Sequence, residues 1–206
     1  MAKKQTLKKV TEKKVSAPVG TVKAEPKVVT IEKPKVGEAI LMYQQDTTIN
    51  ENLSNGTLTD KQKECVEKLD KAMCPLADME LNRLVTKSVV KAYMEQTGAK
   101  TIDELSCKVV ENVPFMSVTK NPLRDILEKR YHLGLDKPIC IVIHTGLEGK
   151  VKGLDVMAEL RDEGYENIFA QQKEIILARG QKFRVGKVAY GDEWGEAYPI
   201  LHFYAV

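Results

Sequence analysis

The residues best suited to chemistry lie near the C-terminal end, in the segment QQKEIILARGQKFRV that runs from 171 to 185. It contains a carboxylate and an amide two positions apart, Glu174 and Gln172. Residues two apart in an extended strand point to the same face, so this spacing predicts one shared site. The apolar run Ile175–Leu177 that follows is typical of a strand buried on both faces. A carboxylate leading into such a strand is held at the edge of the core, where burial and neighbours tune it.

The same glutamate has a simpler interpretation. Charged side chains are mostly exposed, and a solvated glutamate at the start of a strand does no chemistry. The segment alone leaves both interpretations open. Beyond it, a glycine-centred turn at 178–181 and the alternating run 182–185 complete a predicted strand, turn and strand.

Two upstream strands carry further polar candidates. The run 113–119 is predicted to be a strand, and it places Ser117 and Thr119 on one face. The run 80–85 alternates roughly as a strand does and contains Arg83. A third run, 138–143, is almost wholly apolar and is predicted to be central in a sheet.

The elements that precede and separate these strands are mostly helical. Apolar spacing predicts one or two helices between 37 and 53, and a capping box at 59–62 starts a helix over 60–73. A helical stripe at 89–94 stops at Gly98, and Asn121–Pro122 starts another helix. Helices first and then mostly strands indicates an α+β fold.

The C-terminal part of the chain is rich in turns. Gly146, Gly149 and Gly153 predict a hairpin whose second arm is 151–156, and their spacing departs from the phosphate-loop pattern. We expect a short helix at 158–164, a loop at 165–170, and strands at 185–190 and 198–206.

Composition bounds the class of protein. With 206 residues, the chain is long enough for one sizeable core. Its 43% hydrophobic and 30% charged residues are ordinary for a soluble globular protein. No apolar run approaches the roughly 18 residues of a membrane span, and no apolar segment follows the basic N-terminus as in a secretory signal. We therefore expect a cytoplasmic protein with no membrane partner.

The cysteines and histidines show no metal-binding spacing. Cys65, Cys74, Cys107 and Cys140 are widely separated, and the three histidines are scattered. We therefore expect buried thiols and no structural metal.

The basic charge is concentrated in residues 1–36. This stretch holds ten lysines against three glutamates, a net charge of +7, which leaves −4 for the rest of a chain whose total is +3. It has no aromatic residue and three prolines, so we expect a disordered basic arm ahead of a folded domain at 37–206. The arm either binds nucleic acid, a ribosome or an acidic protein, or only keeps the chain soluble; its composition does not decide.

Taken together, several stretches resemble the ADP-ribosyltransferase superfamily, in the branch marked by an arginine, a Ser-x-Ser/Thr strand and a Gln/Glu-x-Glu pair. Bacterial toxins and phage-encoded enzymes belong to this branch. The resemblance covers about 40–206. Its motifs are, in the family's order, the Ile-Asn-x-x-Leu stretch at 49–53, Arg83 in DMELNRL, FMSVT at 115–119, and Gln172-Lys173-Glu174 with the strand, Arg-Gly turn and strand that follow. The fold implied is N-terminal helices followed by a mostly antiparallel two-sheet β core.

The resemblance implies transfer of ADP-ribose from NAD, as co-substrate, to a macromolecule. Loss of nicotinamide develops positive charge on the ribose, which a fixed carboxylate stabilises; this role falls to Glu174. Arg83 would clamp the NAD phosphates through its planar fork of donors. Ser117 would hydrogen-bond and orient Glu174, and Thr119 would support the strand. Tyr131 is a candidate for stacking on nicotinamide.

The resemblance also bears on the acceptor. Gln172 would position the accepting group, and a glutamine there favours acceptors other than arginine. The loop from Tyr165 to Ala170 matches the segment with which relatives recognise protein targets, and Phe169 is its candidate contact residue. Phe169 tucked into the core is an equal alternative.

Two functional hypotheses follow. The first is a mono-ADP-ribosyltransferase, phage-encoded and aimed at host transcription or translation proteins such as RNA polymerase or ribosomal proteins, with a secreted toxin domain or a nucleic-acid acceptor left open. The second is a binding module with a degraded site that docks through its basic arm. Asn82 and Leu84 motivate the second, because the family usually has an aromatic before the arginine and a glycine after it.

Overall fold

The computed structural model of the protein describes residues 35–129, 137–146, 150–165, 170–192 and 197–206. Its α-helices are α1 (Gly37–Gln45), α2 (Ile49–Asn55), α3 (Asp60–Ala72), α4 (Lys87–Thr97), α5 (Leu123–Glu128) and α6 (Val156–Asp162), with short 3-10 helices η1 (Asp103–Leu105) and η3 (Ala170–Gln172). Its strands are β1 (Cys74–Pro75), β2 (Glu80–Val85), β3 (Val109–Asn112), β4 (Met116–Thr119), β5 (Ile139–His144), β6 (Lys152–Asp155), β7 (Glu174–Leu177), β8 (Gln181–Val185), β9 (Ala189–Gly191) and β10 (Tyr198–Ala205).

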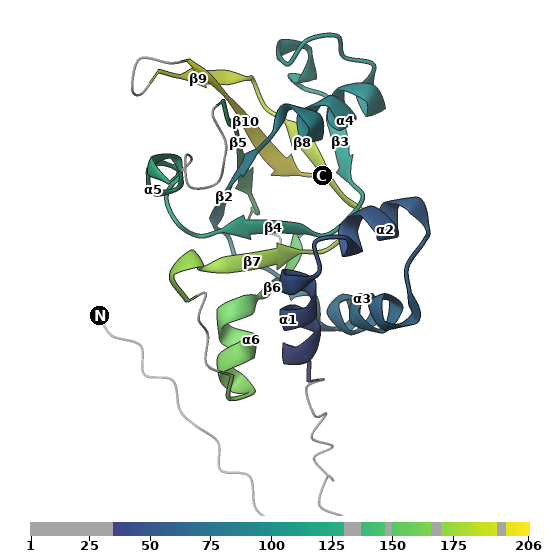
Figure 1. Ribbon diagram of the computed structural model, residues 1–206. Coiled ribbons are helices and arrows are strands. Elements are labelled where there is room, and N and C mark those ends of the chain that lie inside the picture. Colours follow the sequence, from purple (N-terminus) through teal and green to yellow (C-terminus); the bar gives the residue numbers. More distant parts are fainter. Residues whose placement is uncertain (1–34, 130–136, 147–149, 166–169, 193–196) are drawn as a thin grey trace, which may run out of the picture. The chain divides into compact units, whose positions relative to one another are not determined.

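The strands follow one hydrogen-bonded path, β1-β6-β7-β4-β2-β5-β10-β8-β3, with β9 beside β10. The pairings are antiparallel except for the parallel pair β5 and β10. β2 joins β4 through a single register pair, Asn82 with Thr119, and β4 and β7 run across the direction of β2, β5 and β10 (Figure 1). The sheet thus has a first half (β1, β6, β7, β4) and a second half (β2, β5, β10, β8, β3). This mixed, mainly antiparallel α+β architecture confirms the predicted fold class.

Alternation along β4 and β7 gives the first half two buried faces. Met116, Val118, Ile175 and Leu177 join a core cluster with residues of the second half, including Ile141 and Phe203. On the other face, Ile176 of β7 and Phe115, the residue just before β4, pack into a cluster with residues of α1, α3 and α6. These three helices, called the helical layer below, lie beneath β4 and β7 in Figure 1. Strand β7 is therefore buried on both faces, as its apolar run predicts.

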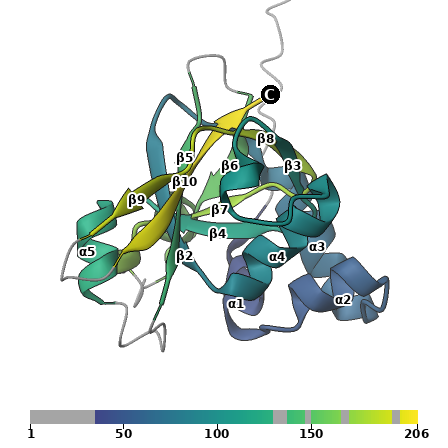
Figure 2. The same cartoon turned by 90° about the horizontal axis from the view of Figure 1, so that it is seen from above.

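The second half is covered differently. Leu127 of α5 is buried together with Cys140 of β5 and Tyr198 of β10. Figure 2 shows α5 on the opposite side of β2 from α1 and α3. At the end of the path, the Gln96 side chain in α4 donates to the carbonyl of Glu111 and accepts from its N–H, both at 3.0 Å.

Locally encoded elements agree with their sequence signals. Thr59 and Gln62 form the complete capping box at the start of α3. Gly98 ends α4 with a left-handed φ of 69°. Strand β5 lies between β2 and β10, and only its last residue, His144, is not buried.

Strand partners differ from two predictions. The hairpin expected at 146–156 is wrong, because β5 pairs with β2 and β10 while β6 pairs with β1 and β7. Likewise β7 and β8 flank one turn but pair with other strands in different halves. A glycine turn reverses the direction of the chain but does not determine which strand the next strand pairs with. Here the chain passes from one half of the sheet to the other after the turn. The strand expected from 113 begins only at Met116, and β3 was not predicted.

Two smaller expectations also change. Cys65 and Cys140 are buried as expected, but Cys74 in the edge strand β1 and Cys107 are exposed. Burial raises the pKa of the Cys65 thiol to about 11. Val36 is fully buried, and its N–H is bound by Glu163, so the folded part includes this residue.

Among the described helices, none is long and apolar enough to cross a membrane.

Candidate functional site

A pocket of ≈ 370 Å³ lies beside the first residue of β7. This volume is near the lower end of the range for ligand sites. The helical layer and the first half of the sheet both contribute to it. Its lining residues are Tyr43, Gln44, Asp46, Thr47, Asn50, Ser117, Gln172 and Glu174.

Glu174 occupies the edge of the core, as its place ahead of an apolar run predicts. It starts β7 opposite Thr119 and is half-buried. Its carboxylate Oε2 accepts a hydrogen bond from Nε2 of Gln44 at 2.7 Å. Hydrogen bonds to ionised groups are the stronger kind, so α1 fixes the orientation of this carboxylate.

Ser117 has a different partner from the one the sequence suggests. The register places it opposite Ile176, two residues along β7 from Glu174. Its Oγ makes a long contact of 3.5 Å with the Tyr43 hydroxyl. The hydrogen bond to the Glu174 carboxylate comes from Gln44 instead. The offset in register explains why Gln44 and not Ser117 is the partner of the carboxylate.

Tyr43 connects the helical layer to the strand that carries Ser117. Asn50 Nδ2 donates to the Tyr43 hydroxyl at 3.0 Å and to the carbonyl of Phe115 at 3.2 Å. The ring also packs edge-on against Phe115, at 5.8 Å between centroids. Burial raises the pKa of Tyr43, while hydrogen bonds from Ser117 and Asn50 and the charge of Arg83 act in the opposite direction.

Two atoms of the lining are buried and unpaired. Within the described residues, Gln44 Oε1 and Asn50 Oδ1 have no hydrogen-bond partner. Buried polar atoms are nearly always paired, so these two acceptors are exceptions among the described residues, together with Asn82 Oδ1 outside the lining.

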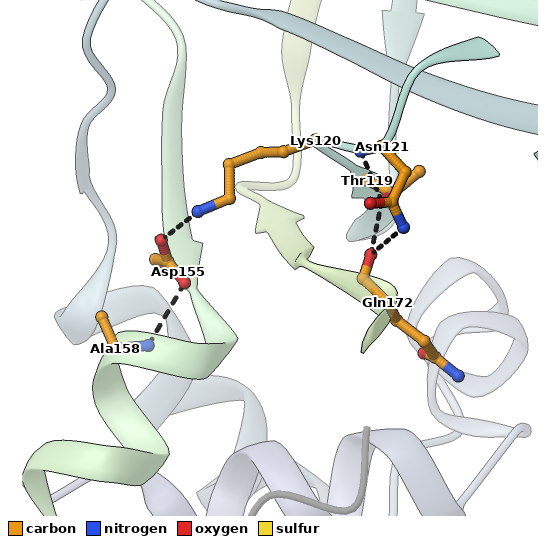
Figure 3. Close-up of polar contacts among 6 residues, drawn as sticks. All are labelled: Thr119, Lys120, Asn121, Asp155, Ala158 and Gln172. Atoms are coloured by element: carbon orange, nitrogen blue, oxygen red, sulfur yellow. Dashed lines mark hydrogen bonds and ion pairs between the residues drawn. The ribbon is translucent and has the colours of Figure 1, made fainter. Parts of the chain in front are cut away.

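Gln172 reaches the pocket by another backbone path than expected. The prediction of an extended strand from Gln172 to Glu174 is wrong, because Gln172 ends η3 and Lys173 has a φ of 45°. Thr119 Oγ1 and Asn121 Nδ2 hold the carbonyl of Gln172. Figure 3 shows this carbonyl pointing toward them while the Gln172 side chain extends away. Gln172 and Glu174 nevertheless line the same pocket.

Arg83 does not line the pocket, although its charge acts on the lining residue Tyr43. It is half-buried in β2, opposite Ile141 of β5. Its charge acts to lower the pKa of two buried hydroxyls, Tyr43 and Tyr93, against the larger effect of burial. Within the described ranges, its guanidinium makes no hydrogen bond or ion pair.

The remaining candidates fall into two groups. Tyr165 is half-buried and packs against the cluster of the helical layer. Phe169 and Tyr131 lie outside the described residues. The sequence missed Gln44, and it gave Tyr43 only as an apolar helix residue; the motif at 49–53 was the one signal that pointed to this part of the pocket.

Comparison of structures places the fold among ADP-ribosyltransferase toxins. C3stau2 from S. aureus with NAD is 17% identical, with 84% of this chain and 86% of that chain covered and a TM-score of 0.59. Plx2a, an ADP-ribosyltransferase toxin from Paenibacillus larvae, is 12% identical over 82% and 85%, with a TM-score of 0.55. The enzymatic component C2-I of the Clostridium botulinum C2-toxin is 16% identical over 82% of this chain but only 42% of its own, with a TM-score of 0.60.

Comparison of sequences adds nothing to this: no protein-family model and no curated protein matches. At 12–17% identity, the structural likeness shows the fold. The chain therefore has the fold of the ADP-ribosyltransferase toxins, and this confirms the resemblance at the level of architecture.

Proposed function

We propose that the chain is an NAD-dependent mono-ADP-ribosyltransferase that modifies a protein target. The observation that carries the proposal is the placement of Glu174. In an ADP-ribosyltransferase fold, its carboxylate lines a pocket, is oriented by Gln44 at 2.7 Å, and shares the lining with Ser117 and Gln172.

The lining suits the nicotinamide half of NAD. Ribose hydroxyls and a carboxamide group donate and accept hydrogen bonds, which matches a lining of amide, hydroxyl and carboxylate side chains such as Asn50, Ser117 and Glu174. A pocket of ≈ 370 Å³ suits one half of a dinucleotide rather than the whole. The guanidinium of Arg83, unpaired within the described ranges, would supply charge for the phosphates. C3stau2, solved with NAD, supports this choice of ligand.

The proposed chemistry is a substitution at the ribose carbon that bears nicotinamide. The bond from this carbon to the ring nitrogen breaks, and nicotinamide leaves with the electron pair as a neutral molecule. Positive charge develops on the ribose in the transition state, and the carboxylate of Glu174 stabilises it. A nucleophile of the target then bonds to the same carbon and releases a proton.

The acceptor and the target are proposed on chemical grounds. Gln172 at the pocket lining would contact the accepting group, and an amide there favours acceptors other than arginine, since it brings no charge to pair with a guanidinium. A phage-encoded enzyme acting in the host cytoplasm on transcription or translation proteins remains our proposal for the setting.

The test is incubation of the purified protein with labelled NAD and bacterial lysate, followed by mass spectrometry of the labelled proteins. Transfer by the wild type that is lost in Glu174→Gln is the expected result. No transfer, or equal transfer by this variant, would contradict the proposal.

A second candidate is a binding module with a degraded site. The position of Arg83 outside the pocket lining favours it. Calorimetry with NAD separates the candidates, because saturable binding that is lost in Arg83→Ala is not compatible with a degraded site.

A further inference from the structure

The three residues ahead of Glu174 are held by the three that end and follow β4. All three carbonyls of segment 171–173 accept hydrogen bonds from segment 119–121, and Figure 3 shows those to Gln172. The donors are Asn121 Nδ2 to the carbonyls of Gln171 (2.9 Å) and Gln172 (3.3 Å), Thr119 Oγ1 to that of Gln172, and the Lys120 N–H to that of Lys173 (3.1 Å).

These bonds are the tertiary support of segment 171–173 that the described residues show. Its residues are exposed and precede β7, so they have no strand ladder. Lys173 has a φ of 45°, a value that side chains other than glycine rarely adopt. Such a backbone persists where surrounding structure holds it in place.

Asn121 is itself fixed from two sides. Its N–H donates to Thr119 Oγ1 at 3.0 Å, and its carbonyl accepts from Asn82 Nδ2 at 3.2 Å. Asn82 is only 2% exposed, so the contact anchors Asn121 to the sheet interior. Lys120 is tied separately, through an ion pair of 2.7 Å with Asp155.

Glu174 does not share this dependence. It is placed by its pairing with Thr119 along β4 and by the hydrogen bond from Gln44. For Gln172, in contrast, the hydrogen bonds found within the described residues all go to its backbone carbonyl, from Thr119 and Asn121.

We infer that Asn121 is a positioning residue that sets Gln172 at the acceptor side of the pocket, and so governs transfer to a protein without governing cleavage of NAD. This inference rests on the proposed function. After nicotinamide leaves, either water or the target nucleophile bonds to the ribose carbon and gives up a proton. A displaced Gln172 misplaces only the target nucleophile, so water takes a larger share and free ADP-ribose accumulates.

The experiment measures two rates in Asn121→Asp and Asn121→Ala. One is nicotinamide release from NAD alone, and the other is transfer of biotin-labelled ADP-ribose to proteins of a bacterial lysate. We expect the ratio of transfer to release to fall about 10-fold, since small misplacements of a reacting group cost 10-fold or more. Release from NAD alone should stay within about two-fold of the wild type, because Glu174 keeps its supports.

Lys120→Met is the matched control, because it removes the ion pair with Asp155 but keeps the backbone N–H that binds Lys173. It should keep the wild-type ratio. If both rates fall together in Asn121→Ala, or if the ratio does not change, Asn121 has no positioning role. If the wild type labels no protein, the proposed function itself is wrong. If the wild type labels protein but has the same ratio of transfer to release as the Asn121 variants, only the inference about Asn121 is wrong.

Discussion

The two halves of the sheet place polar residues in different surroundings. In the first half, Glu174 faces the helical layer and has a hydrogen-bonded partner of its own, Gln44. In the second half, Arg83 lies between the buried residues Leu81 and Val85 of the same strand, and its guanidinium makes no bond within the described ranges. The Glu174 carboxylate is fixed by a hydrogen bond, whereas the Arg83 guanidinium has no such partner among the described residues.

This difference suggests a division of work. A carboxylate that must meet charge developing in a transition state gains from being held in place beforehand. A guanidinium that binds a phosphate gains its partners from the ligand, so it needs none in advance. The first half would then govern the rate of reaction, and the second half the affinity for NAD.

Glu174→Gln should give the largest effect. We expect ADP-ribose transfer to fall about 10³-fold with little change in NAD affinity, because the amide keeps the shape but removes the charge. Labelled-NAD kinetics and calorimetry measure the two quantities. Glu67→Gln, an exposed helix position, is the matched control. A large loss of affinity with the rate unchanged would reverse the roles of the two halves.

Arg83→Lys should weaken NAD binding about 10-fold with a smaller change in kcat, since lysine keeps the charge but loses the planar fork. Calorimetry with NAD measures the affinity. Arg184→Lys, at an exposed position of β8, should leave it unchanged. If NAD binds Arg83→Lys and the wild type equally, Arg83 has no part in binding.

Gln44→Leu should lower kcat up to about 10-fold, because the carboxylate of Glu174 loses its half-buried donor, and the fold stability should be unchanged. The neighbouring change Gln45→Leu, at an exposed position, provides the control. Steady-state kinetics and urea unfolding are both required. A loss of stability without a loss of kcat would make Gln44 a purely structural residue.

The smallest expected effect is a dependence of the fold stability on pH that comes from His202 in the second half of the sheet. Burial and the adjacent His144 lower the pKa of His202 below its ordinary 6.5, while Glu80 acts to raise it. The folded protein therefore binds this proton less readily than the unfolded chain does. The stabilisation is present above pH 6.5 and is lost as pH falls below it. The urea midpoint should drop between pH 7.5 and 5.5, and drop less in His202→Gln; an equal drop in both would exclude His202 as a source.

Features encoded by neighbouring residues were predictable. The capping box at Thr59 and Gln62, the glycine that ends α4 and the apolar run of β5 each depend on a few adjacent positions. The three motifs at Arg83, Ser117 and Glu174 were also predictive of the fold. Their types and their order can be read directly from the sequence, without knowing which residues meet in space.

Features encoded by distant partners were not predictable. Gln44 bonds Glu174 across 130 positions, and no periodicity in α1 marks it out. Gln172 was assigned to a strand because the alternation rule ignores backbone φ, and Lys173 takes a value the rule does not allow for. Which strand pairs with β5 depends on how the two halves pack, and turn residues carry no information on this.

The amide of Gln96 also has a consequence beyond the fold of one molecule. An outermost strand normally presents free N–H and C=O groups that another chain can pair with, and this is a route to aggregation. Among the described residues β3 pairs with β8 alone, and on its other side Gln96 satisfies both groups of Glu111 as a neighbouring strand would. At Glu111, the two groups through which a foreign strand would add to β3 are thereby already bonded.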